Sequence, residues 1–140
     1  MKRNLVLLTL VAVLVVMASF ASAGAGAAMR IHVPFNFYIQ DQLLPAGDYR
    51  FEMGSGPSAV PSLVTVQDPD GTGMIMLTTP GGLDSDSDLS VLRFNQYGDK
   101  YFLSHVSIRG HKANVKMFNL EKELRSQYQN ARATTLFARN

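Results

Sequence analysis

The feature that most constrains the fold is the strict alternation of apolar and polar residues over short segments. Every odd position in residues 31–39 is apolar, and the even positions are polar or proline except for Tyr38. Successive side chains of a strand point to opposite faces, so this pattern predicts a half-buried strand. Pro34 cannot donate to a strand ladder, so we expect this strand at a sheet edge or with a bulge at that position.

A second alternating segment follows after a short interval. Tyr49, Phe51 and Met53 alternate with charged residues. The residues between the two segments, 44–47, read Leu-Pro-Ala-Gly. Proline presets φ for the first corner of a turn and glycine accepts a positive φ. The two segments are therefore predicted to form a hairpin.

Further strands are predicted at fairly regular spacing. Residues 63–67 and 74–79 flank Asp-Pro-Asp-Gly, and residues 89–97 and 100–108 flank Gly-Asp, so each pair predicts a hairpin. The continuous apolar run of 74–79 indicates burial on both faces, or methionine filling irregular space. In the strand 100–108 we expect Phe102, Ser104, Val106 and Ile108 on one face, with His105 on the other. Residues 113–117 and 134–138 complete the set.

The period changes near the C-terminal end. Leu120, Leu124, Tyr128 and Ala131 fall on one helical face, which predicts an amphipathic helix over 120–131 with Asn119 as its N-cap. Glu121 and Arg125 have the spacing of a favourable pair on the helix surface. A helix this short is not stable alone and should pack on the sheet.

These elements define the expected fold class. We expect a mostly β protein, an antiparallel sandwich or small barrel of about seven or eight strands with one late amphipathic helix. The choice between sandwich and closed barrel stays open, because pairing of non-neighbouring strands leaves no local mark in a sequence. A length of 140 residues fits one domain.

The N-terminal segment reads as a secretory signal peptide. Lys2 and Arg3 precede an uncharged apolar run, and Ala21-Ser22-Ala23 offers small residues where a signal peptidase cuts. We expect residues 1–23 to be removed and residues 24–140 to form the mature β-rich domain, ordered from about residue 29. A second cleavage site is possible after Ala27. The mature protein is then periplasmic or extracellular, bacterial, and not membrane-spanning.

Composition and charge exclude several classes of protein. The chain has no Cys, which excludes disulfides, thiolate metal sites and cysteine nucleophiles. Loss of Lys2 and Arg3 would reduce the basic residues from 13 to 11, equal to the acidic residues. Such neutrality argues against nucleic acid as a partner. The charge is split, however: residues 41–99 are acidic and residues 100–140 are basic, which predicts either mutual packing or a basic face for lipid headgroups or polysaccharide.

Three motifs resemble those of a family of small secreted bacterial proteins of unknown function. They are Val-Pro-Phe-Asn-Phe at 33–37, Leu-Pro-Ala-Gly-Asp-Tyr at 44–49 and Tyr-Gly-Asp-Lys-Tyr-Phe-Leu at 97–103. The family pattern has Asp where this chain has Asn36, which disfavours an acidic catalytic role there. The resemblance covers most of residues 30–125 and implies a shared fold, with no activity attached.

Metal binding has one candidate segment. Asp84, Asp86 and Asp88 alternate as in the start of a calcium loop. The match ends there, because Leu89 stands where the loop requires Gly and Asn95 where it requires Glu. A solvated acidic loop is the simpler interpretation, and no cofactor is expected.

No catalytic motif is present, so an enzyme is not expected. Ser104 and His105 are neighbours on a strand and point to opposite faces, so they cannot pair directly. His32, His105 and His111 lack metal-ligand spacing, and we expect His105 to be partly buried and hydrogen-bonded. A hydrolase with an unassigned site remains a third hypothesis.

The function expected from the sequence is that of a secreted, non-enzymatic binding or interaction module. In one version it uses a surface or an exposed edge strand, such as the one carrying Pro34, to bind a cell-envelope component. In the other, a small barrel binds an apolar small molecule, with Met74 and Met76 lining it. Filling of the core is the simpler interpretation of the aromatic residues. These are Phe35, Phe37, Tyr49, Phe51 and Phe102.

Overall fold

The computed structural model describes residues 26–54, 63–83 and 88–138, so the expected signal peptide lies outside the described residues. Within these ranges ten strands and one helix are formed. They are β1 (Ala27–Val33), β2 (Phe37–Ile39), β3 (Gln42–Leu44), β4 (Gly47–Met53), β5 (Leu63–Gln67), β6 (Gly73–Leu83), β7 (Val91–Tyr97), β8 (Lys100–Ile108), β9 (His111–Val115), α2 (Asn119–Gln127) and β10 (Arg132–Phe137). The described helix is too short to cross a membrane.

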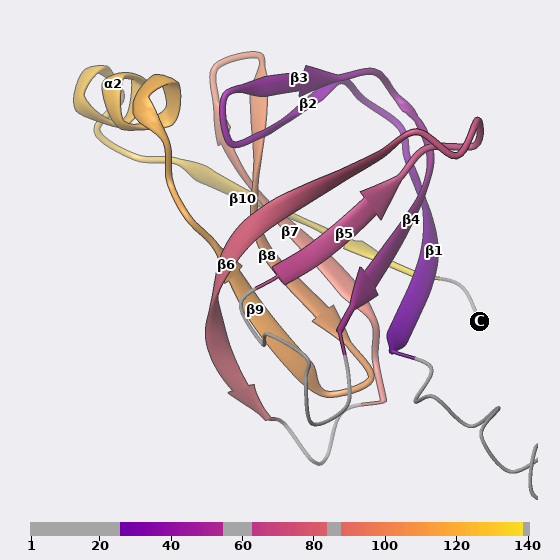
Figure 1. Ribbon diagram of the computed structural model, residues 1–140. Coiled ribbons are helices and arrows are strands. Elements are labelled where there is room, and N and C mark those ends of the chain that lie inside the picture. The colour runs from indigo at the N-terminus through magenta and orange to yellow at the C-terminus, as the bar shows by residue number, and fades with distance from the viewer. Residues whose placement is uncertain (1–25, 55–62, 84–87, 139–140) are drawn as a thin grey trace, which may run out of the picture.

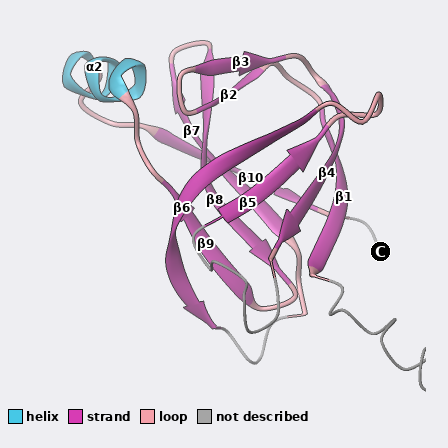
Figure 2. Ribbon diagram, in the orientation of Figure 1, coloured by secondary structure: helices cyan, strands magenta, loops and turns pink. Residues whose placement is uncertain are grey.

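The strands form one strongly curled sheet that folds over itself. Its hydrogen-bonded order is β1-β4-β5-β6-β9-β8-β2-β3, with β7 on β8 and β10 on β7. In Figure 1 the layer of β1, β4, β5 and β6 lies across the layer of β7, β8 and β9. All pairs are antiparallel except β2 with β8. The expected mostly β, sandwich-like class with one late helix is confirmed (Figure 2), with ten strands where seven or eight were expected.

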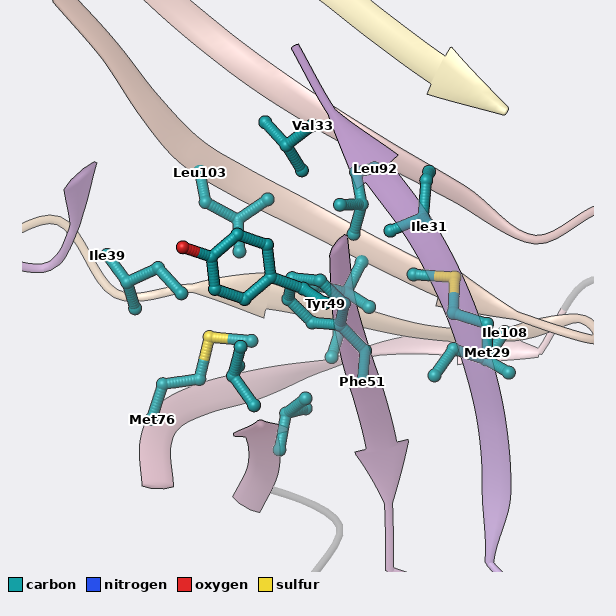
Figure 3. Packing of buried hydrophobic residues seen from close by; sticks show 14 of the residues in the cluster. Met29, Ile31, Val33, Ile39, Tyr49, Phe51, Met76, Leu92, Leu103 and Ile108 are labelled. Carbon is teal, nitrogen blue, oxygen red and sulfur yellow. The ribbon is translucent and has the colours of Figure 1, made fainter. Parts of the chain in front are cut away.

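The core lies between the two layers and is filled by the inward halves of the alternating strands. Along β1 and β4 the buried positions are the odd ones, as the sequence predicts. Figure 3 shows Phe51 and Tyr49 from β4 meeting Met76 from β6 and Leu103 from β8. Burial of this kind contributes about 25 cal/mol per Å² of apolar surface. The largest fully buried side chains include Phe37, Phe51, Phe94, Ile39, Met76, Leu92 and Leu103.

The first alternating segment is not one strand. It is split at Pro34 into β1, which pairs with β4, and β2, which pairs with β3 and β8. The two predicted segments do pair, through β1 and β4, but they do not form one simple hairpin, because the β2–β3 hairpin is inserted between them. Proline at the break fits, because it cannot donate to a ladder.

Side chains from two of the sequence motifs hold this break together. The Asn36 amide oxygen accepts a hydrogen bond from the Ala46 backbone N–H at 2.9 Å. The Tyr49 hydroxyl donates to the Pro45 carbonyl oxygen at 2.7 Å. The Asn36 side chain thus has a structural role.

The hairpin of β5 and β6 forms as predicted around Asp68–Gly71. The Asp68 carboxylate accepts the Thr72 backbone N–H at 2.8 Å, and Gly71 has a φ of 81°. Burial of β6 on both faces is wrong: Met76 is fully buried, whereas Ile75 and Leu77 are 64% and 52% exposed. The strand has one inner face because nothing among the described residues covers the other.

The hairpin of β7 and β8 also forms across Gly98 and Asp99, but it contains a bulge. Arg93 pairs with His105 and Phe94 with Leu103, which leaves Ser104 as the extra residue. Leu103, Val106 and Ile108 consequently share the core between the layers, whereas Phe102 is buried apart from this cluster, against Tyr38 and Tyr97. The expected common face of Phe102, Ser104, Val106 and Ile108 is therefore wrong, because the bulge reverses the alternation.

The helix is shorter than the sequence predicts. It ends at Gln127, because Tyr128 adopts an extended backbone, and Ala131 lies beyond it. Asn119 is its first residue and not its N-cap; the cap position is occupied by Phe118, which makes no side-chain capping bond. The predicted last strand is present as β10, which pairs with β7.

Candidate binding site beside helix α2

The chemistry-bearing residues singled out in the sequence do not converge in the part of the chain that the structure describes. Of the three acidic candidates only Asp88 lies in the described residues, where it is exposed; Asp84 and Asp86 fall outside them. No group of three or more His, Asp or Glu side chains with metal-site geometry is found in the described ranges.

The histidines and the serine beside one of them have separate local partners. His32 Nδ1 lies 2.9 Å from Asp48 Oδ1, and His105 Nδ1 lies 2.9 Å from Asn114 Oδ1. The Ser104 hydroxyl donates to the Arg93 carbonyl oxygen at 2.9 Å. His105 is partly buried and hydrogen-bonded, as expected, and Ser104 is engaged at the bulge.

A buried carboxyl group lies where the helix meets the outer face of the β7–β8 hairpin. Glu121 is only 5% exposed. Asn95 Nδ2 donates to Glu121 Oε1 at 2.9 Å, and the Tyr97 hydroxyl also hydrogen-bonds this carboxyl. Asn95 and Tyr97 alternate with the core residue Phe94, so they project from the opposite face of β7. The helix is therefore fixed to the sheet by a polar contact of Glu121, its one buried residue.

Burial sets the electrostatics of this contact. It raises the pKa of the Glu121 carboxyl, although the bonds from Asn95 and Tyr97 and the nearby Arg125 charge act in the opposite direction. Burial, and next the Glu121 charge, raise the pKa of the Tyr97 hydroxyl. A buried carboxyl with two donors is stabilised, because each donor offsets part of the lost hydration.

Both ends of the helix are held by residues from elsewhere. At the start, the Asp41 carboxylate in the β2–β3 turn accepts the Leu120 backbone N–H at 3.1 Å. Past the end, the Tyr128 ring lies 6.4 Å from the Tyr97 ring, centroid to centroid. The Tyr128 hydroxyl would approach a Cβ at Gly98 to 3.0 Å, and Gly98 has a φ of 61°. Glycine is thus favoured at position 98 for two reasons: its φ is positive, and a side chain there would meet the Tyr128 hydroxyl.

These contacts leave a polar hollow of about 340 Å³ between β7 and the segment that leads from α2 to β10. Tyr128 borders it with 44% of its surface exposed. Glu121 does not line it, since its partners cover the carboxyl. The side chains around the hollow include Asn95, Tyr97, Arg125, Tyr128, Gln129 and Asn130.

A second hollow of about 200 Å³ adjoins the first through Asn130 and is lined by Gln96, Gly98, Asn130 and Arg132. We name the two together the α2 groove. Arg125 and Arg132 are both exposed, and neither makes a salt bridge with any described residue. The groove therefore combines two guanidinium groups, several amides and one exposed aromatic ring.

Sequence reasoning missed the buried role of Glu121. Its spacing to Arg125 suggested an exposed helical pair, and no local pattern distinguishes that from a carboxyl turned toward the sheet. The Tyr-Gly-Asp turn was identified as a hairpin signal, but its contact with Tyr128 depends on the return of the chain through β10. The Met residues proposed to line an apolar site, Met74 and Met76, pack with the core.

Comparisons with protein-family models, curated proteins and solved structures gave no match for this chain. The interpretation of the α2 groove therefore rests on its own geometry and chemistry.

Proposed function

We propose that the mature chain is an exported, non-enzymatic binding module that recognises an acidic polysaccharide of the cell envelope in the α2 groove. The observation that carries the proposal is the pair of arginines, Arg125 and Arg132, that border the amide-lined α2 groove and form no salt bridge with a described residue. Guanidinium groups bind carboxylates through paired, charge-assisted hydrogen bonds.

The remaining groups of the groove suit a sugar. Asn and Gln side chains both donate and accept, which matches hydroxyl groups. The exposed ring of Tyr128 offers a flat apolar surface with a polar tip. A hollow of about 340 Å³ lies at the small end of ligand sites, which run from roughly 300 to 1,000 Å³. Such a size fits single sugar units of a chain that continues along the surface.

The position of the groove also supports binding without catalysis. Glu121 bonds Asn95, which lines the groove, and this carboxyl already has two donors of the protein as partners. A general acid must reach the atom it protonates within about 3 Å. A carboxyl enclosed by Asn95 and Tyr97 instead keeps the groove in shape.

Binding of a short oligogalacturonate, compared with a neutral malto-oligosaccharide of equal length, tests the proposal by calorimetry. We expect the acidic chain to bind and the neutral chain to bind at least about tenfold more weakly. The double variant Arg125→Gln/Arg132→Gln should abolish the preference. Arg109→Gln, at the opposite end of β8, is the matched control and should retain it. Equal binding of both chains, or no binding of either, contradicts the proposal.

Export is a separate part of the proposal and has its own test. Cleavage after Ala23 would leave residues 24–26 ahead of β1, whereas cleavage after Ala27 would remove its first residue. The first site is therefore the one compatible with a whole sheet. Intact mass spectrometry of protein recovered from a bacterial periplasm should give a chain beginning at Gly24. A mass that retains residues 1–23 would rule out this processing.

A further inference from the structure

A third hollow, bordered by charged side chains of both signs, lies on the outer face of the other layer, over β1, β4 and β5. It has a volume of about 390 Å³. Met29, Ile31, Tyr49 and Phe51 are buried, so the residues that alternate with them project outward over this face. The side chains that border the hollow include Arg30, Arg50, Gln67, Asp48 and Asp68.

Two arginines stand directly opposite each other at this hollow. Arg30 on β1 and Arg50 on β4 are register partners, and Gln67 on β5 is the next residue in the same row. Like charges directly opposite on antiparallel strands destabilise the sheet. Arg50 Nη2 lies 3.2 Å from Glu52 Oε2, whereas Arg30 forms no salt bridge with a described residue. An anionic group bridging the two guanidiniums would remove the repulsion.

The same hollow carries negative charge on its other side. Asp48 contacts His32, and one oxygen of Asp68 accepts the Thr72 backbone N–H. Each carboxylate keeps a further oxygen with free acceptor capacity. A purely anionic ligand would be repelled by these groups, and a purely cationic one by the arginines. Charge complementarity therefore favours a ligand with both signs.

We propose that this hollow binds a small zwitterion, whose acidic group lies between Arg30 and Arg50 and whose ammonium group faces Asp68 and Asp48. The acidic group is a phosphate or carboxylate, since both match the planar guanidinium fork. The proposal is independent of the α2 groove, because no residue borders both sites.

The test compares a zwitterion with its two halves. Phosphoethanolamine, inorganic phosphate and ethanolamine are titrated separately into the isotope-labelled mature protein, and amide shifts of β1, β4 and the 68–71 turn are followed by NMR. We expect saturable binding of phosphoethanolamine, at least about tenfold tighter than either half. Binding of phosphate as tight as that of phosphoethanolamine would overturn the proposal, and so would the absence of any binding.

Two variants assign the charges. Arg30→Gln and Asp68→Asn should each weaken phosphoethanolamine binding about tenfold or more. Asn keeps an oxygen for the Thr72 N–H, and Arg30 is exposed, so both variants should fold. Arg109→Gln, which borders neither the hollow nor the α2 groove, is the control and should bind as the unmodified protein does. An Asp68→Asn variant with unchanged affinity would refute the zwitterion assignment.

The source of the zwitterion is distinguished by the form of the probe. Vesicles of phosphatidylglycerol, whose headgroup has no ammonium group, with and without phosphatidylethanolamine present the headgroup on a surface, and free phosphoethanolamine presents it in solution. Arg30-dependent co-sedimentation only with the ethanolamine-containing vesicles would assign a lipid headgroup. Binding of the free compound alone would assign a soluble metabolite-sized zwitterion.

Discussion

The two faces of the β7–β8 hairpin exclude water in different ways. The inner face does so with Leu92, Phe94 and Leu103, which contact other apolar side chains from several strands. The outer face does so with the buried Phe102 ring and, beneath helix α2, with a polar contact of Asn95, Tyr97 and the Glu121 carboxyl. Apolar burial is non-directional, and many arrangements satisfy it. Polar burial is directional, and it stabilises only when every partner is present.

This difference predicts how each face responds to substitution. Loss of an inner side chain leaves a cavity whose cost scales with the volume removed. Loss of an outer partner leaves a donor or acceptor without a bond, and that cost is local to the helix junction. Variants on the two faces should therefore differ in what they disturb as well as in size.

The largest effect is expected on the inner face. Phe94→Ala removes a fully buried ring that packs edge-on against Phe35 and Phe37. We expect a loss of about 3–5 kcal/mol in the free energy of unfolding, from lost burial and the cavity left behind. Urea denaturation followed by circular dichroism measures it. A loss below 1 kcal/mol would show that the core is not organised around this ring.

The next effect separates charge from hydrogen bonding on the outer face. Glu121→Ala leaves Asn95 and Tyr97 without their acceptor, and we expect a loss of about 1–3 kcal/mol at neutral pH. Glu121→Gln keeps an acceptor oxygen without the buried charge, so it should cost less than the alanine variant. Equal losses for the two variants would contradict a hydrogen-bonded role for this side chain.

Comparison of the unmodified protein with Glu121→Gln also predicts how the contribution of Glu121 to stability changes with pH. The pKa of Glu121 is raised in the folded protein, so the folded state binds its proton more tightly than the unfolded state. Stability contributed by this group is therefore fully present below the ordinary glutamate pKa and is lost as pH rises through the folded pKa. The stability of the unmodified protein minus that of Glu121→Gln should fall across that window. If this stability difference rose with pH instead, the pKa of Glu121 would be lowered, not raised, in the folded protein.

Much of the fold follows from local pattern. The alternation in 31–39 and 49–53 predicts most of the residues there that enter the core, and the turn residues at 68–71 and 98–99 predict two hairpins correctly. Alternation predicts the wrong face for residues of a strand where a single extra residue is inserted. Ser104 is such a residue, because the bulge reverses the faces of β8 on either side of it, and no turn signal marks it.

Much less of the candidate sites than of the fold can be predicted from the sequence. The Glu121 contact joins residues 26 positions apart, and the Asp41–Leu120 bond spans 79. The opposition of Arg30 and Arg50 depends on a register that the intervening β2–β3 hairpin does not disturb. Such contacts are set by topology, whereas periodicity reports only which face a residue occupies.

A smaller effect is expected from the distant helix cap. Asp41→Ala removes the acceptor for the Leu120 N–H, and we expect a loss of about 1 kcal/mol. The effect should be concentrated in α2, whose amides would exchange faster with deuterium while those of β4 and β5 would not. Asp70→Ala, in the exposed turn between β5 and β6, is the control. Uniform acceleration over the whole chain would instead indicate global destabilisation.

The smallest effect comes from the residue next to a core position. Ile75 and Met76 are neighbours on β6, yet Ile75 is 64% exposed and Met76 is fully buried. Ile75→Thr keeps a β-branched side chain on the outer face, so we expect a change within about 0.5 kcal/mol. Met76→Ala should cost about 2–5 kcal/mol, because it empties space between the layers. A large loss for Ile75→Thr would mean that this face of β6 is covered in solution, and the division into inner and outer faces would then not hold for this strand.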